Sequence, residues 1–139
     1  MATPREVVEC VHRLVLERDV EGQADLFAPD GVLEWPFAPA GVPDRLEGRE
    51  AIRAVLEPLG RRIRQAATRL TGVRSLVHET LDPEVVVIEL ELEGEVAATG
   101  ETYRLPYVQV FRVREGAIVS FRDYFGPRTA EALAAAFRD

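Results

Sequence analysis

Residues 108–126 read VQVFRVREGAIVSFRDYFG, a stretch that predicts two antiparallel strands joined by a tight turn at Glu115-Gly116. Side chains alternate between the two faces of a strand, and Arg112 and Arg122 belong in water. The alternate positions therefore face the core, and Asp123 is one of them. A buried carboxylate costs stability unless it is hydrogen-bonded, paired or used in chemistry.

The same alternation predicts the inward residues of the other strands. The strand over 102–113 turns one set toward the core, namely Tyr103, Leu105, Tyr107, Gln109, Phe111 and Val113. The last strand turns in Val119, Phe121, Asp123 and Phe125, and the strand over 84–95 turns in Val86, Ile88, Leu90 and Leu92. Gln109 and Asp123 are thus polar groups on a mainly apolar inner face, whereas Glu89, Glu91 and Glu93 form a solvated outer face.

Helices and one strand precede these strands. A capping box at residues 3–6 predicts a first helix to about Arg18, and Asp19 caps a short second helix. The stretch APDG at residues 28–31 predicts a turn, and VLEWPF at residues 32–37 predicts a strand with Leu33, Trp35 and Phe37 on one face. Residues 47–70 predict a helix that Pro58 breaks or kinks.

The second half predicts an antiparallel sheet. Further strands are expected at 72–81 and 84–95, with a hairpin at Gly94, and a last helix begins at Pro127. The order of helices, one strand, a helix and an antiparallel meander indicates an α+β fold. With 139 residues, the chain is expected to form a single domain over residues 1–139.

Composition excludes several classes of function. The net charge of -7 argues against nucleic acid and against anionic membrane surfaces, and no apolar run approaches the ~20 residues of a membrane span. The first ten residues lack a signal peptide, and the single cysteine, Cys10, cannot form an internal disulfide, so a cytoplasmic location is expected. The absence of lysine excludes Schiff-base catalysis. His12 and His78 lack a metal-ligand spacing and are interpreted as packing or surface residues, so no metal or organic cofactor is expected.

Two interpretations of Asp123 follow from its inward position. In the first, the carboxylate is structural and is held by an arginine, such as Arg53 or Arg13, or by a hydrogen bond. In the second, it lies at the base of an apolar cavity walled by aromatic residues, namely Trp35, Phe37, Tyr107 and Phe121. Desolvation there would raise the pKa of Asp123 above the ~3.9 of a free aspartate and make it a general acid or base.

Much of the chain resembles the nuclear-transport-factor-2-like superfamily, which includes SnoaL-like polyketide cyclases, ketosteroid isomerases and limonene epoxide hydrolases. The resemblance rests on residues 7–37, on LEGREAIRAVL at residues 46–56 and on residues 108–126. It implies a cone, in which a curved antiparallel sheet wraps around helices and encloses an apolar pocket. It also implies a homodimer formed through the outer face of the sheet, where Val108 and Val110 are expected to be exposed.

The resemblance also implies site residues. Asp123 falls where limonene epoxide hydrolases carry a catalytic aspartate, and Gln109 falls at the oxyanion donor of the isomerases. The hydrolase's arginine in the middle strand and the isomerase's base before Pro36 have no equivalent here. We therefore predict Asp123 and Gln109 as catalytic residues, and we predict five ligand-binding residues: Trp35, Phe37, Tyr107, Phe111 and Phe121.

The function expected from this resemblance is an enzyme for a small apolar molecule such as a polyketide, terpenoid or steroid-like compound. Asp123 would transfer a proton in an isomerisation, cyclisation or hydrolysis. The alternative is a module of the same fold that binds a small ligand, or dimerises, without catalysis.

Overall fold

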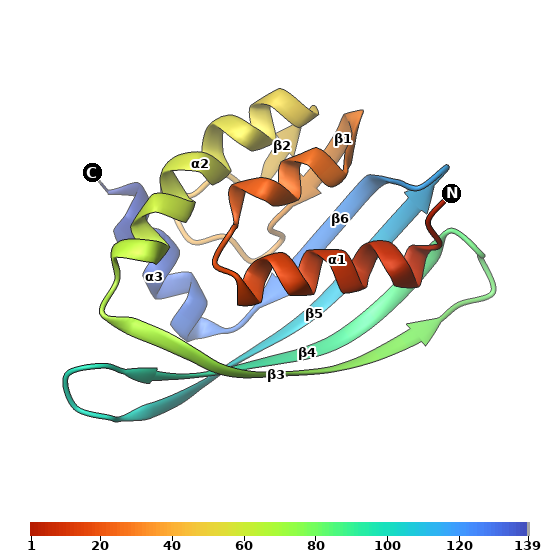
Figure 1. Cartoon of the computed structure of the whole chain (residues 1–139). Helices are drawn as coiled ribbons and strands as arrows, with labels where there is room; N and C mark the ends of the chain where they lie inside the picture. The colour runs from red at the N-terminus through yellow and green to blue at the C-terminus, as the bar shows by residue number, and fades with distance from the viewer. Residues whose placement is uncertain (139) are drawn as a thin grey trace.

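A computed structural model describes residues 1–138 and contains one curved sheet with helices on its inner face (Figure 1). The helices are α1 (Pro4–Leu16), the 3-10 helix η1 (Glu21–Leu26), α2 (Arg49–Gln65) and α3 (Pro127–Phe137). The strands are β1 (Phe27–Glu34), β2 (Arg45–Glu47), β3 (Thr68–Glu79), β4 (Val85–Val96), β5 (Thr102–Arg114) and β6 (Ala117–Phe125). The predicted α+β class is confirmed.

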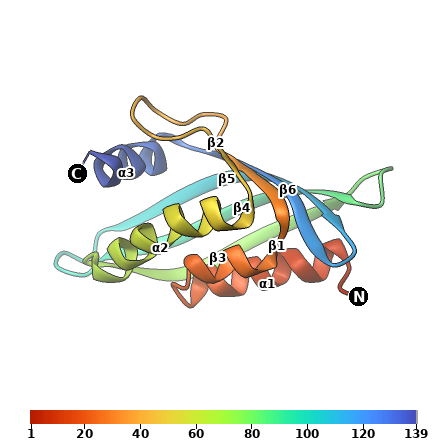
Figure 2. The ribbon, with the colours of Figure 1, turned by 90° about the horizontal axis from the view of Figure 1, so that it is seen from above.

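The sheet has the order β2-β1-β6-β5-β4-β3. Each neighbouring pair is antiparallel except β1 and β6, which run parallel because the chain passes from β1 through α2 and the meander before it returns. Seen from above, α1 and α2 lie over the inner face with η1 in contact with both, and α3 lies at one end of the sheet (Figure 2). None of the helices within residues 1–138 is both long and apolar enough to cross a membrane.

The predicted first helix forms as the capping box indicates. The Oγ1 of Thr3 accepts a hydrogen bond from the backbone N–H of Glu6 at 3.2 Å, and the carboxylate of Glu6 accepts one from the N–H of Thr3 at 2.9 Å. Two orphan N–H groups at the helix start are thereby satisfied. Asp19 plays a similar part before η1, where its Oδ1 accepts from the N–H of Gly22 at 3.0 Å.

Two predictions for the first half of the chain are wrong. The stretch at residues 28–31 is part of β1 rather than a turn, and the pairing of β1 with β6 is irregular between Phe27 and Val32. The predicted helix over residues 47–70 ends at Gln65, so residues 68–70 belong to β3; Pro58 lies inside α2 and does not break it. The short strand β2 was not expected, because it has only three residues.

The sheet register confirms most of the inward residues. Val86, Ile88, Leu90, Leu92 and Phe111 are buried. The register shifts between Arg112 and Val113, so Ile118 is buried in place of the predicted Val119. Gly94 lies inside β4 under the ring of Tyr103 and does not form the hairpin, which turns instead at Gly100 with a φ of 71°.

Candidate active site

Asp123 and Gln109 face each other across β6 and β5, as the alternation predicts. The side-chain Nε2 of Gln109 donates a hydrogen bond to the Oδ1 of Asp123 at 3.3 Å. Gln109 is 5% exposed, and Asp123 is partly exposed. The two predicted catalytic residues therefore form one hydrogen-bonded pair on the inner face of the sheet.

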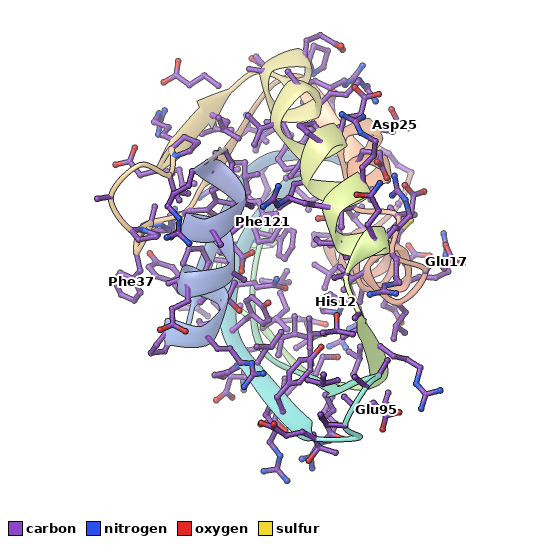
Figure 3. All side chains as sticks on the ribbon, turned by 90° about the vertical axis from the view of Figure 1, so that its left-hand side faces the viewer. His12, Glu17, Asp25, Phe37, Glu95 and Phe121 are labelled. Carbon is purple, nitrogen blue, oxygen red and sulfur yellow. The ribbon has the colours of Figure 1, made fainter. Side chains whose placement is uncertain are left out.

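His12 joins this pair from the helix layer. Its Nε2 lies 3.0 Å from the Oε1 of Gln109 and donates to it, and the histidine is only 9% exposed. In Figure 3, His12 lies on the inner side of the molecule, between the helices and the sheet. Sequence reasoning missed this contact, although the spacing of Val8, Val11 and His12 already places the histidine on the buried face of α1.

Burial sets the acid–base properties of the pair. Desolvation raises the pKa of Asp123 to about 7, and the hydrogen bond from Gln109 only partly opposes it. Burial also lowers the pKa of His12, so the imidazole favours its neutral form. A carboxyl with a pKa near neutrality can both accept and donate a proton.

No arginine pairs with Asp123 among the described residues. Arg53 instead binds Asp25 at 2.9 Å, and Arg13 donates to the sulfur of Cys10 at 3.2 Å. The ion-pair interpretation of Asp123 is therefore wrong. Among residues 1–138, the hydrogen bond from Gln109 is the polar contact of the carboxylate.

Tyr107, on β5, lies near the carboxylate of Asp123. Its hydroxyl forms a hydrogen bond with the Oγ1 of Thr129 in α3 at 3.1 Å. Burial raises the pKa of Tyr107 far above its usual range, and the charge of Asp123 raises it further. Tyr107 therefore stays a neutral hydroxyl that links β5 to α3.

The predicted aromatic wall is only partly assembled. Phe111 and Phe121 are buried and stacked with ring centroids 4.0 Å apart, and Trp35 is buried edge-on against Phe137 at 6.3 Å. Phe37 does not point inward. It is 65% exposed and contacts the ring of Tyr124, and in Figure 3 its side chain lies at the edge of the molecule.

Phe37 was predicted to point inward by strand alternation, but the strand ends before this residue. β1 ends at Glu34, and residues 35–38 form a turn in which the N–H of Ala38 donates to the carbonyl of Trp35. Pro36, which lacks an N–H, cannot continue the strand ladder. The strand period therefore does not apply to Phe37.

Several apolar side chains are packed against the core but keep some exposed surface. They come from the helices and from β5, and they are Val15, Val55, Leu59, Leu105, Ala130 and Phe137. A hollow of about 700 Å³ lies instead on the outer face, where its lining includes Phe37, Leu76, Val108 and Tyr124. The apolar cavity beside Asp123 remains a prediction. Within residues 1–138, no cluster of three or more His, Cys, Asp or Glu is placed to hold a metal ion.

Comparison with known proteins identifies the family. A model of the SnoaL-like domain matches residues 7–121. The chain belongs to the SnoaL-like family. This SnoaL-like protein is 36% identical over 130 residues to an uncharacterised PhzA/B-like protein of Pseudomonas aeruginosa, covering 93% of this chain and 89% of the relative. It is 33% identical over 113 residues to the uncharacterised protein YesE of Bacillus subtilis, covering 81% and 74%.

Solved structures place this SnoaL-like chain in the nuclear-transport-factor-2-like superfamily. A candidate isomerase of Bacillus subtilis superimposes with a TM-score of 0.76 at 29% identity, covering 94% of this chain and 91% of the other. A Mycobacterium tuberculosis protein crystallised with estradiol-17β-hemisuccinate has a TM-score of 0.65 at 27% identity, covering 91% and 97%. The family and these neighbours favour isomerase- or cyclase-type chemistry on a small molecule.

Proposed function

We propose that this protein is a cytoplasmic enzyme that moves a proton within a small apolar molecule. Asp123 is the proton-transfer group, and the reaction is an isomerisation, cyclisation or hydrolysis of a polyketide, terpenoid or steroid-like compound. Gln109 holds the carboxylate with one amide hydrogen, and its second amide hydrogen is suited to a carbonyl or hydroxyl of the substrate.

One observation carries this proposal: Asp123 is an inward carboxyl that has no cationic partner among residues 1–138 and has a pKa of about 7. At neutral pH, its ionised and protonated forms are both populated, which suits a group that takes and returns a proton. A purely structural carboxylate would be stabilised more strongly by an arginine than by an amide, and this chain contains 17 arginines.

The partly exposed apolar side chains support the choice of substrate. Val55, Leu59 and Phe137 come from α2 and α3, and Leu105 comes from the same face of β5 as Gln109. An apolar molecule resting against them would approach the carboxyl and exclude water from it. That exclusion would keep the pKa of Asp123 raised during the reaction.

The most direct test measures whether the protein catalyses proton exchange and product formation in a small apolar molecule. Apolar ketones and enones of polyketide, terpenoid and steroid type are incubated with the protein in heavy water, and mass spectrometry measures deuterium uptake and product formation. Asp123→Asn should slow turnover by about 100-fold or more while leaving ligand affinity unchanged. Asp30→Asn is the matched control, because Asp30 is exposed on β1. A ligand that binds tightly but never reacts would support the non-catalytic module instead.

The assembly proposed for this enzyme is a homodimer through the outer face of the sheet. Val108 and Leu76, which line the outer hollow, are 44% and 56% exposed. A second copy of the chain would cover them. Sedimentation should give a dimer that Val108→Glu dissociates, whereas Leu81→Glu, at a fully exposed turn position, should leave it intact. A wild-type monomer at micromolar concentration would contradict the dimer.

A further inference from the structure

His12 is hydrogen-bonded to Gln109 but has no role in the reaction proposed above. His12 from α1, Gln109 from β5 and Asp123 from β6 form one chain of hydrogen bonds with links of 3.0 and 3.3 Å. Gln109 and His12 are both at least nine-tenths buried. Water therefore has little access to the amide between them, and each polar atom depends on its neighbour.

An amide is a directional link, because one end accepts a hydrogen bond and the other end donates. In the structure, the Oε1 of Gln109 faces His12, so the imidazole must carry a proton on Nε2. The Nε2 of Gln109 faces the carboxylate oxygen of Asp123, which accepts. This arrangement matches an ionised Asp123.

We propose that Gln109 is a reversible relay that ties the tautomer of His12 to the protonation state of Asp123. When Asp123 takes up a proton, its O–H becomes a donor, and the amide turns over so that Oε1 accepts from it. The Nε2 of Gln109 then donates to a bare Nε2 of His12. The amide turns over when this contact opens briefly to water, and the imidazole then loses its proton at Nε2 and takes one at Nδ1, so its own proton count does not change.

The surroundings leave this chain free of competing partners. On α1, Glu9 is the charged group that acts on His12, and it is exposed. On β5, the hydroxyl of Tyr107 lies near Asp123 but is engaged with Thr129 of α3. Neither group replaces a link of the chain, so the orientation of Gln109 is set by His12 and Asp123.

This inference rests on the proposed function and adds a role for His12. The histidine is a positioning residue, because it acts through Gln109 and not on the substrate. It gives the amide a satisfied partner in both orientations, so Asp123 can act as a base and then as an acid without leaving a buried polar atom unpaired. The relay would thus support both halves of a proton transfer.

The test is nitrogen NMR of the two histidines in the full-length protein. At about pH 8.5, His12 should carry its proton on Nε2, and at about pH 6 on Nδ1, with a roughly five- to tenfold change in tautomer ratio. The midpoint should coincide with the titration of Asp123 followed by carbon NMR. His78 is an internal reference, since it lies exposed on β3 and binds Glu89 at 2.8 Å.

Two variants test whether the relay, rather than burial alone, sets the tautomer of His12. Gln109→Met should make the His12 tautomer independent of pH while Asp123 still titrates. Asp123→Asn, which removes the titrating carboxyl, should likewise make the His12 tautomer independent of pH if the first variant does not fold. A wild-type His12 that keeps Nε2–H as Asp123 titrates would overturn the relay, as would a His12 that is already charged when Asp123 takes up its proton. Loss of turnover in Asp123→Asn tests the enzyme separately, so either idea can fail without the other.

Discussion

The two faces of the sheet treat carboxylates in opposite ways. On the outer side, Glu84 accepts hydrogen bonds from Arg112 at 2.9 Å and from Arg114 at 2.9 and 3.0 Å, and these contacts lower its pKa to about 2. On the inner side, Asp123 has an amide as its partner, and burial raises its pKa to about 7. Glu84 lies in the turn before β4 and Asp123 lies on β6, and the two carboxyls differ chiefly in their neighbours.

This difference separates a carboxylate that supports the fold from one that is available for chemistry. The guanidinium groups keep Glu84 ionised over nearly all conditions, so it cannot exchange protons near neutral pH. Burial destabilises the charged form of Asp123, and its pKa is therefore raised to a value at which it gains and loses a proton near neutral pH. The arginines Arg112 and Arg122 point to the outer face, and among residues 1–138 the inner carboxyl has no ion pair.

The largest expected effect comes from neutralising the inner carboxyl. Because the folded-state pKa of Asp123 is raised, the wild type loses stability as the pH rises from about 4 to about 7, and the loss persists above that. Asp123→Asn should therefore be more stable than the wild type at about pH 8, by at most about 4 kcal/mol, with partial exposure of the carboxyl reducing the gain. Denaturant unfolding measures it, and below about pH 4 the two proteins should be alike. A less stable Asn variant at pH 8 would mean that Asp123 is a structural carboxylate.

A smaller effect is expected from removing the amide. Gln109→Met leaves His12 and Asp123 without their buried partner and should reduce the free energy of unfolding by about 1–3 kcal/mol. The same variant should raise the pKa of Asp123 above about 7, because the hydrogen bond from Gln109 lowers it. Gln65→Met at the exposed end of α2 is the control. An unchanged pKa in Gln109→Met would show that the amide does not stabilise the carboxylate.

The smallest effect belongs to the outer face. Glu84→Gln should lower the melting temperature slightly at pH 7, since its ion pairs are surface contacts. The folded-state pKa of Glu84 is lowered, so its contribution is present above about 4.5 and is lost as the pH falls toward about 2. The difference from the wild type should shrink over that range and in high salt, whereas Glu57→Gln, at an exposed position of α2, should show no such trend.

The sequence predicted the register of the inner face better than it predicted the site. Outward arginines in β5 and β6 placed Gln109 and Asp123 correctly, because a continuous strand keeps its period of two. The prediction failed where that period is interrupted, at Phe37 after Pro36 and at Ile118 beside the shifted register. His12 was overlooked because a contact between a helix and a strand 97 residues apart has no local signal beyond the burial of its face.

The central claim is that Asp123 is a desolvated carboxyl with no ion pair among residues 1–138. Its titration in the wild-type protein tests this claim most directly. Carbon NMR of the Asp123 carboxyl, assigned by comparison with Asp123→Asn, should show a midpoint near pH 7. A midpoint for Asp123 at or below the ~3.9 of a free aspartate would contradict the account.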